Sequence, residues 1–312
     1  GKEVTNKTKD PIKEFANAAR QGFKFQNAMS VGTPADGGYT VPEDILTRIE
    51  KYKEAKRSLK DLVRVEKVTT NKGQRTFKKR SQQTGFTKVG EGGKIGAKAT
   101  PQFERISYEI DKYAGYFPVT NELLQDSDQA IVDTLVEWIG DESRVTENKL
   151  ILEQIATLPA VEFTGLDDIK KALNVTLGQA FKPTSKIITN DDGLQYLDTL
   201  KDEKGNYLLQ PNPQEPMQMR LCAGATTIPV EVVPNDDMPT TENKIPFIIG
   251  DLKEGVVFWD RQLMNIRTSD VATVGELNAY EEDLTLFRAI EREDVTLRDT
   301  KAVVNGYIDV TP

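Results

Sequence analysis

Apolar and polar residues alternate along two stretches of residues 62–120, on either side of a segment rich in Gly and Lys. In the first stretch, Val63 and Val65 alternate with charged residues. The second stretch alternates in the same way, with three apolar and three polar positions: Ile106, Tyr108 and Ile110 against Ser107, Glu109 and Asp111. A period of two residues predicts β-strands with one face covered.

These two stretches predict the limbs of a long β-hairpin. Each limb has about 20 residues and reaches roughly 65 Å at about 3.3 Å per residue, whereas a globule of this chain length has a diameter of about 50 Å. A two-stranded ribbon is only marginally stable alone in water. We therefore expect the hairpin to lie against another copy of the chain, which favours an assembly protein over a solitary enzyme.

Two helices are predicted on either side of this hairpin. The first begins near Pro42 and carries Ile45, Ile49 and Tyr52 on one face. The second begins at residues 126–129, which have the spacing of a capping box. It runs to Leu158, ahead of Pro159, and is about 45 Å long. Gly140 lies inside this helix and marks either a close approach or a bend.

The rest of the chain divides into an N-terminal arm and a mixed α/β region. Residues 1–37 contain few apolar side chains, so we expect this arm to bury little surface against its own body and to be either flexible or held by a partner. Beyond residue 160, five short apolar runs predict strands: Lys186–Thr189, Ile228–Val233, Phe247–Ile249, Val256–Trp259 and Val295–Leu297.

Charge is distributed unevenly along the 312 residues. The chain has a net charge of −8, which argues against tight and general binding of nucleic acid. Residues 62–100 carry ten basic and two acidic residues, a net charge of +8, so the remainder carries −16. A cationic hairpin on an anionic body is suited to lie across the next copy of that body. The alternative is a solvated basic ribbon that contacts nothing.

The sequence offers little for catalysis, and we expect no enzymatic activity, no cofactor and no metal. It contains no His and a single Cys222, which removes the commonest general base and the usual nucleophile pairs. Residues 90–94 (GEGGK) lack the spacing of a phosphate-binding loop. Three pairs of adjacent acids are interpreted as solvated caps of turns and helices: Asp191–Asp192, Asp236–Asp237 and Glu281–Glu282. A carboxylate-dependent hydrolase remains an alternative function. No membrane-spanning stretch is present, and no membrane partner is expected.

The order of these features resembles the major capsid proteins of tailed bacteriophages of the Hong Kong 97 type. Individually weak matches occur in the family's order, beginning with GGYTVPE at residues 37–43 and the basic hairpin. The later matches are FPVT at 117–120 before the long helix, GNYLLQP at 205–211, FIIGDL at 247–252 with WDR at 259–261, and residues 288–294. Encapsulin nanocompartment shells share the fold and remain the near alternative.

The resemblance implies an α+β, Hong Kong 97-like capsid fold with an arm, an extended loop, a spine helix, a peripheral domain and an axial domain. We place the segments as follows: 1–37 the N-terminal arm; 38–61 the helix that leads into the peripheral domain; 62–120 the extended hairpin loop and return strand; 121–158 the spine helix; 159–240 mainly the axial domain; 241–312 peripheral-domain strands with a possible return to the axial domain.

The resemblance also implies function and partners. The chain is expected to self-assemble in the cytoplasm of a host bacterium into pentamers and hexamers of an icosahedral shell, the virion capsid, around double-stranded DNA. Portal, scaffold segment and prohead protease are the further expected partners. Removal of a leading segment by that protease would explain a first residue of Gly1, as would cloning. Some relatives form a covalent cross-link between a Lys of the extended loop and an Asn of the peripheral domain. The loop lysines here are Lys78, Lys79, Lys88 and Lys94, and Asn305 is a late Asn, but we do not expect the reaction in this chain.

We assign the contacts between neighbouring subunits to aromatic and basic residues of the arm and hairpin. Apolar side chains are expected to dock on neighbours, and basic ones to select orientation and partner. The predicted contact residues are Phe15, Phe23, Arg75, Phe77, Lys78, Lys79, Arg80, Phe86, Lys88 and Lys94.

Overall fold

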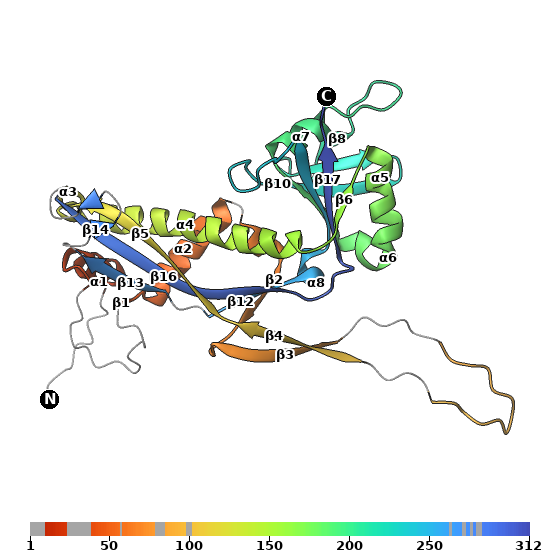
Figure 1. The fold of residues 1–312 in the computed structure, drawn as a ribbon, viewed down its shortest axis with the longest axis horizontal. Helices are drawn as coiled ribbons and strands as arrows, with labels where there is room; N and C mark the ends of the chain where they lie inside the picture. Colours follow the sequence, from red (N-terminus) through yellow and green to blue (C-terminus); the bar gives the residue numbers. More distant parts are fainter. Residues whose placement is uncertain are drawn as a thin grey trace.

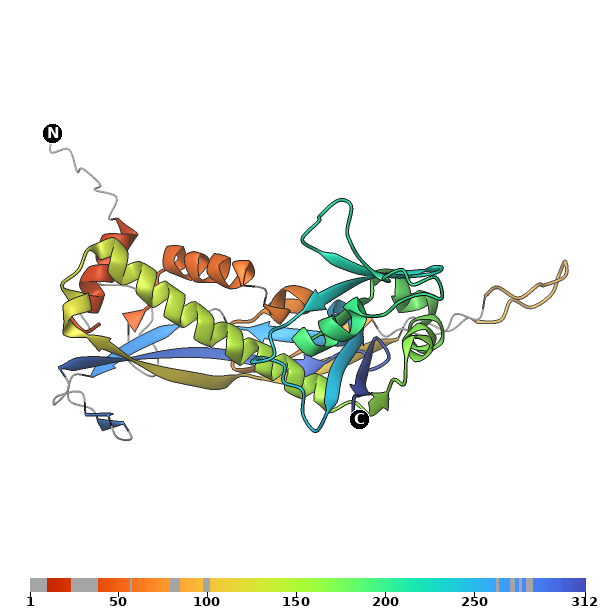
Figure 2. The same ribbon diagram turned by 90° about the horizontal axis from the view of Figure 1, so that it is seen from above.

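The computed structural model describes residues 10–23, 39–56, 58–78, 85–97, 102–261, 264–269, 273–274, 277–278 and 283–312. One long helix, α4 (Asp128–Ala156), lies along an elongated sheet and ends beside a second sheet (Figures 1 and 2). Its apolar residues belong to the cores at both ends, so α4 ties the two parts of the molecule together.

The elongated sheet is built around one long strand, β16 (Leu284–Leu297). Strand β5 pairs with one edge of β16, and β13 and β12 pair in succession with the other. Strands β1 and β2 extend the sheet beyond β13 and β12. The bounds of these strands are β1 (Tyr39–Thr40), β2 (Arg64–Lys67), β5 (Asp111–Thr120), β12 (Val256–Asp260) and β13 (Asn265–Ser269).

Helix α2 (Glu43–Ala55) packs closely on α4, as the apolar face predicted at its start requires. Ile45 and Ile49 are buried in the core between α2, α4 and the elongated sheet. At Gly140 of α4, an added Cβ would lie 2.5 Å from a ring carbon of Tyr52. Of the two roles predicted for this glycine, the close approach of two helices is therefore the one observed.

Helix α1 (Pro11–Arg20) corrects the prediction for the N-terminal arm. Phe15 is fully buried against α4 and the elongated sheet, with its ring centroid 5.5 Å from that of Phe23. Arg20 donates a hydrogen bond of 2.8 Å to the Asp126 carbonyl and pairs with Asp128. The expectation that residues 1–37 bury little against their own body is wrong for residues 11–23.

The second sheet has seven strands, in the order β6-β17-β11-β7-β10-β9-β8. Its strands β11 (Lys244–Gly250) and β17 (Val303–Asp309) come from the C-terminal quarter of the chain, yet they pair with β7 and with each other. The remaining strands come from the middle of the chain: β6 (Ala160–Glu162), β7 (Lys186–Thr189), β8 (Leu209–Pro211), β9 (Met219–Ala223) and β10 (Thr226–Val232). Residues 241–312 were predicted to supply peripheral-domain strands with a possible return to the axial domain. In the structure β11 continues the second sheet, and the chain returns to this sheet with β17 after forming β12 to β16.

Short helices and turns complete the molecule. Most of them cover the seven-stranded sheet, and its core is closed by buried side chains such as Phe163, Phe181 and Leu197. The bounds are η1 (Leu59–Leu62), α3 (Asn121–Leu124), α5 (Leu166–Lys171), η2 (Ala172–Thr176), α6 (Gly178–Phe181), η3 (Lys182–Thr184), α7 (Asp191–Asp198) and α8 (Leu252–Gly255). The two-residue strands β14 (Thr273–Val274) and β15 (Leu277–Asn278) pair with each other.

The predicted hairpin is present but shorter than expected. Its paired limbs are β3 (Lys72–Lys78) and β4 (Phe103–Glu109), in antiparallel register from Lys72 opposite Glu109 to Lys78 opposite Phe103. The remaining parts of both stretches join the elongated sheet as β2 and β5. Val63 is buried and Val65 is exposed, so the predicted shared face of these two side chains is wrong.

The predicted start of the long helix is shifted by one residue. The N-cap is Ser127, whose side chain accepts a hydrogen bond from the amide of Ala130, rather than Asp126. All five predicted strands after residue 160 are present. The last predicted strand, Val295–Leu297, is only the end of β16. The first ten residues of β16 were not predicted, because they mix apolar, charged and polar side chains without a clear period.

Candidate functional site

The base of the hairpin is fixed to the body by an aromatic cluster around Trp259 of β12. Tyr108 stacks on the Trp259 ring at a centroid distance of 4.6 Å, and Phe77 meets its edge at 6.3 Å. The Trp259 indole donates a hydrogen bond of 2.8 Å to the Thr296 hydroxyl. The guanidinium carbon of Arg298 lies 4.7 Å from the Phe77 ring centroid. Burial of this cluster holds β3 and β4 at a set angle to the elongated sheet.

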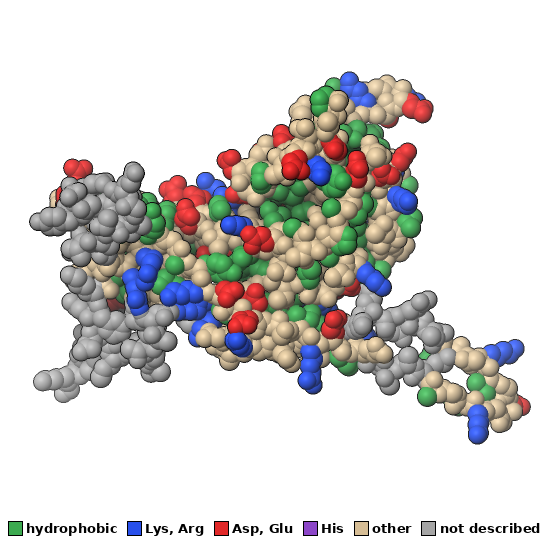
Figure 3. All heavy atoms as spheres, in the orientation of Figure 1, with side chains coloured by type: hydrophobic (Ala, Val, Ile, Leu, Met, Phe, Trp, Pro, Cys, Tyr) green, Lys and Arg blue, Asp and Glu red, His purple; other side chains and the backbone are tan. Residues whose placement is uncertain are grey.

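The distal part of the hairpin leaves the body altogether (Figures 1 and 2). Phe86 is 100% exposed and Ile95 is 89% exposed, and Phe103 at the end of β4 is 65% exposed. Lys88 and Lys94 lie on the same tip, where Figure 3 shows basic and apolar side chains together. Exposed aromatic and aliphatic side chains this far from their own core are typical of a surface that binds another protein.

The predicted contact residues lie in different surroundings: exposed on the hairpin, turned back to the body, buried in the chain's own cores, or outside the described residues. Phe86, Lys88 and Lys94 lie on the exposed tip, and Lys78 is exposed at the end of β3. Arg75 lies on β3 and turns back to the body, where it donates a hydrogen bond of 3.0 Å to the Lys67 carbonyl.

Phe77 is 7% exposed at the hairpin base, and Phe15 and Phe23 are buried in the core beneath α1. For these three side chains the structure shows contacts within the chain, and the assignment to a neighbouring subunit is wrong in this conformation. Lys79 and Arg80 lie outside the described residues.

The acid pairs considered for catalysis serve local structure where the structure describes them. Asp191 accepts a hydrogen bond of 3.0 Å from the Asn235 amide, and Asp192 accepts one of 2.7 Å from the Thr240 hydroxyl. Asp237 pairs with Arg144 of α4 at 2.5 Å. The Glu281–Glu282 pair lies outside the described residues.

Asn305 and Cys222 have local roles in the second sheet. Asn305 donates a hydrogen bond of 3.2 Å to the Leu158 carbonyl and lies on β17, whereas the tip lysines are on the extended hairpin. Cys222 is partly buried on β9. Among the described residues, no helix is both long and apolar enough to cross a bilayer.

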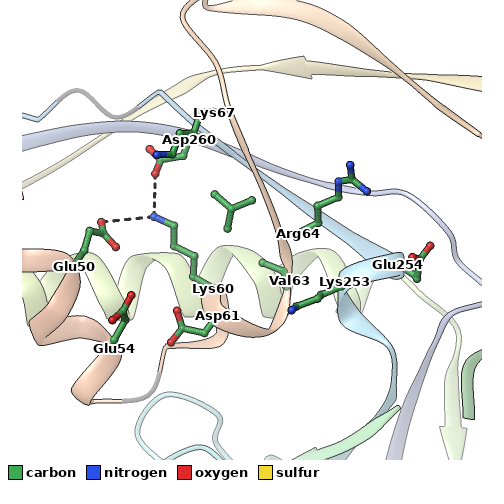
Figure 4. Close-up of a pocket in the computed structure, with 11 residues that line it drawn as sticks. Glu50, Glu54, Lys60, Asp61, Val63, Arg64, Lys67, Lys253, Glu254 and Asp260 are labelled. Carbon is green, nitrogen blue, oxygen red and sulfur yellow. Dashed lines mark hydrogen bonds and ion pairs between the residues drawn. The ribbon is translucent and has the colours of Figure 1, made fainter. Parts of the chain in front are cut away.

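A cluster of buried charges joins α2, η1, α4 and the elongated sheet. Lys53 of α2 lies 2.8 Å from Glu147 of α4, and their side chains are 3% and 1% exposed. Lys60 of η1 lies 3.3 Å from the same carboxylate and 3.0 Å from Asp260 of β12. Figure 4 shows the Lys60 ammonium between Asp260 and Glu50, in the wall of a cavity of about 630 Å³.

These carboxylates determine the protonation of both lysines. Burial lowers the pKa of Lys60, but the charges of Glu147, Asp260 and Glu50 outweigh it and raise the pKa above its ordinary value. The pKa of Lys53 is raised in the same way, against burial, chiefly by Glu147. Both ammonium groups therefore stay charged inside the protein.

Two glutamates of β16 extend the cluster on the other side of Glu147. Burial, reinforced by the Glu147 charge, raises the pKa of Glu291 to about 7. Glu291 accepts a hydrogen bond of 2.8 Å from Ser143, which also lies 3.2 Å from the Lys53 ammonium. Burial and the neighbouring Glu291 also raise the pKa of Glu293, which is 2% exposed.

None of these buried charged residues was among the predicted site residues, although their spacing along the two helices is visible in the sequence. Lys53 follows Ile45 and Ile49 at intervals of four residues, and so lies on the buried face of α2. On α4, Ser143 and Glu147 occupy the same face between Ile139 and Ile151. Polar residues at apolar positions of a helix indicate a buried polar network.

Comparison with known proteins gives a family match over most of the chain. A model of the phage capsid family matches residues 37–307. No curated protein matches the sequence.

Solved structures of capsid proteins have a similar fold. The capsid of an empty GTA particle is 17% identical with a TM-score of 0.60, over 94% of this chain and 98% of that chain. The capsid of a native GTA particle is 17% identical with a TM-score of 0.56, over 95% and 99%. A structure from Mycobacterium phage Ogopogo is 13% identical with a TM-score of 0.54, over 92% and 98%.

Proposed function

This chain belongs to the phage capsid family and is a structural protein of an icosahedral shell, and we propose that it builds a shell of the Hong Kong 97 type from hexamers and pentamers. In this proposal the elongated sheet with α4 forms the peripheral domain and the seven-stranded sheet forms the axial domain. The chain crosses between them three times: after α4, after β11 and after β16.

The exposed hairpin tip is the observation that carries the assembly mechanism. Its base is rigidly packed on Trp259, while Phe86 and Ile95 contact none of the body. Apolar side chains held away from their own core gain free energy when a neighbouring subunit covers them, about 25 cal/mol for each Å² of apolar surface. Many weak contacts of this kind, repeated around closed rings, give a persistent shell.

We propose that the shell encloses double-stranded DNA in the virion and assembles in a host bacterial cytoplasm with a portal, a scaffold segment and a prohead protease. The net charge of −8 suits a container from which nucleic acid must leave. The family membership supports these partners, and the body of the chain needs none of them to form its own cores.

Electron microscopy of purified protein tests the proposal. We expect closed polyhedral shells, or rings of five and six, from the wild-type chain at high protein concentration. The double variant Phe86→Ser/Ile95→Ser is expected to leave the free energy of unfolding unchanged and to raise the concentration needed for assembly at least tenfold, because both side chains lie outside the folded body.

A matched control replaces an equally exposed apolar residue away from the hairpin, Val175→Ser, which is 71% exposed. This variant should assemble like the wild type. Small, uniform particles from the wild type at every salt and protein concentration, with or without co-expressed scaffold, would contradict assembly. Normal shells from the double variant would show that the tip does not hold neighbours.

A further inference from the structure

We propose that Glu147, Glu291 and Glu293 form a binding site for a hard divalent cation, with Ca²⁺ the best fit, which joins the long helix to the central strand of the elongated sheet. One carboxylate oxygen from each residue lies within 4.8 Å of the others. Oxygen ligands bind Ca²⁺ at about 2.3–2.6 Å, so two ligands of one ion are separated by at most about 5 Å. The three carboxylates meet this limit.

The charges around the three glutamates are not balanced. The ion pairs of Lys53 and Lys60 run to Glu147, Glu50 and Asp260. The Oε1 atom of Glu293 is buried and has no hydrogen-bond partner in the described part of the chain. A buried carboxylate oxygen without a partner costs free energy, and a cation shared with its two neighbours supplies the missing interaction.

The carboxylates are also accessible to an ion. They line a cavity of about 570 Å³ together with Thr40 and Thr47. Three further acids and four cations also line it: Glu43, Glu50, Asp260, Lys53, Lys60, Lys67 and Arg292, so acidic side chains outnumber basic ones by six to four. This volume holds several water molecules, which would complete the six to eight ligands that Ca²⁺ takes. An all-oxygen set of ligands selects Ca²⁺, Mg²⁺ or Mn²⁺ over Zn²⁺ and copper. Of these ions Ca²⁺ fits best, because it accepts a flexible coordination geometry, whereas Mg²⁺ demands near-octahedral geometry.

The ammonium groups of Lys53 and Lys60 lie 2.8 Å and 3.3 Å from Oε1 of Glu147. They compensate the charge of this carboxylate and lower the affinity of the site for a cation. We therefore expect a dissociation constant in the range of about 10⁻⁴–10⁻³ M, which is typical of the weaker Ca²⁺ sites in proteins.

Isothermal titration calorimetry and thermal unfolding of the full chain at pH 8, with CaCl₂ added to protein prepared in EDTA, test the site. The wild type should bind one Ca²⁺ per chain, and a hundredfold excess over the dissociation constant should raise the unfolding midpoint by about 5 °C. Glu293→Gln and Glu291→Gln should each weaken binding at least tenfold and lose this shift. Glu142→Gln, an exposed position on the same helix, should behave like the wild type.

Unfolding measured with and without Ca²⁺ distinguishes a cation ligand from a residue with a purely structural role. Without Ca²⁺, Glu293→Gln should be as stable as the wild type or more stable, because it replaces a buried carboxyl group whose Oε1 atom has no hydrogen-bond partner. Loss of stability with and without Ca²⁺, or unchanged Ca²⁺ binding in Glu293→Gln, would overturn the proposal, as would a wild type that binds no Ca²⁺ at 10 times the expected dissociation constant.

If Glu291→Gln and Glu293→Gln both fail to fold, the ion can be located directly in the structure of the wild-type protein. Density maps of wild-type protein prepared with Ca²⁺ and with EDTA should differ by a peak between the three carboxylates. A difference peak elsewhere, or none, would refute the assignment. The result does not depend on shell formation, because all three ligands belong to one chain.

Discussion

One buried carboxylate, Glu147, contacts two lysines inside the protein. Lys53 and Lys60 reach it from α2 and η1, which follow each other in the chain but approach α4 at different points. Ser58 adds a contact of 3.4 Å to the same carboxylate. Buried charges of this kind cost free energy to desolvate, so each partner is needed mainly because the others are present.

Lys53→Met should therefore destabilise the folded chain by about 3 kcal/mol, since it leaves part of the Glu147 charge without compensation. The matched control is Lys51→Met, an exposed position on the same helix, where we expect a change within about 0.5 kcal/mol. Urea unfolding of both variants measures the difference.

The double variant Lys53→Met/Glu147→Gln examines whether the effect comes from charge. It should be more stable than Lys53→Met alone, because the second substitution removes the charge that the first left unpaired. Equal stability of Lys53→Met and Lys51→Met, or a strictly additive double variant, would show that the ion pair contributes little.

At the scale of elements, the unexpected part of the fold is the docking of α1. The helix has few apolar residues, but three of them, Phe15, Ala16 and Ala19, lie on one face and are buried. Phe23 then folds back in a left-handed conformation (φ 48°) to pack on Phe287 of β16 at a centroid distance of 5.4 Å. A few well-placed side chains thus join this segment to the body.

Phe15→Ala should cost about 3–5 kcal/mol of stability, the range for deletion of a fully buried aromatic side chain. Lys13→Ala, on the exposed face of the same helix, should leave stability nearly unchanged. Thermal unfolding distinguishes the two outcomes. If Phe15→Ala matched Lys13→Ala, α1 would be a loosely held arm, as its composition suggests.

The sequence predicted elements with a strong local period and failed where a partner strand decides the structure. The long helix, α2, the five short strands and the alternation of Ile106 and Tyr108 are all present. The pairing of β2 with β12 and of β5 with β16 shortened the predicted hairpin, and neither pairing has a trace in local periodicity. The exposed tip was predicted from its Gly and Lys content. The buried charge cluster could not be assembled from local sequence alone, because its residues come from α2, η1, α4 and the elongated sheet.

At the scale of the whole molecule, positive charge and exposed apolar side chains occur together at the hairpin tip, on a chain whose remainder is acidic. The hairpin region 62–100 carries +8 and the rest of the chain −16. The tip combines Lys88 and Lys94 with Phe86 and Ile95. Charge of this kind steers encounter and orientation, while the apolar side chains supply the affinity of the contact. These two contributions respond oppositely to added salt.

Varying the salt concentration therefore distinguishes the contribution of charge to assembly from that of the apolar contacts. The screening length falls from about 10 Å at 0.1 M to about 3 Å at 1 M, so the initial rate of wild-type assembly, followed by light scattering, should fall severalfold over this range. Lys88→Glu/Lys94→Glu should assemble more slowly than the wild type at 0.1 M salt, and the two rates should converge at 1 M, where the apolar contacts remain.

The control Lys171→Glu/Lys301→Glu makes the same change in net charge, from −8 to −12, at exposed positions on the body. It should slow assembly less than the tip variant, because it removes no positive charge from the hairpin. Equal rates for the two variants at every salt concentration would mean that total charge, and not the cationic tip, governs the encounter of subunits.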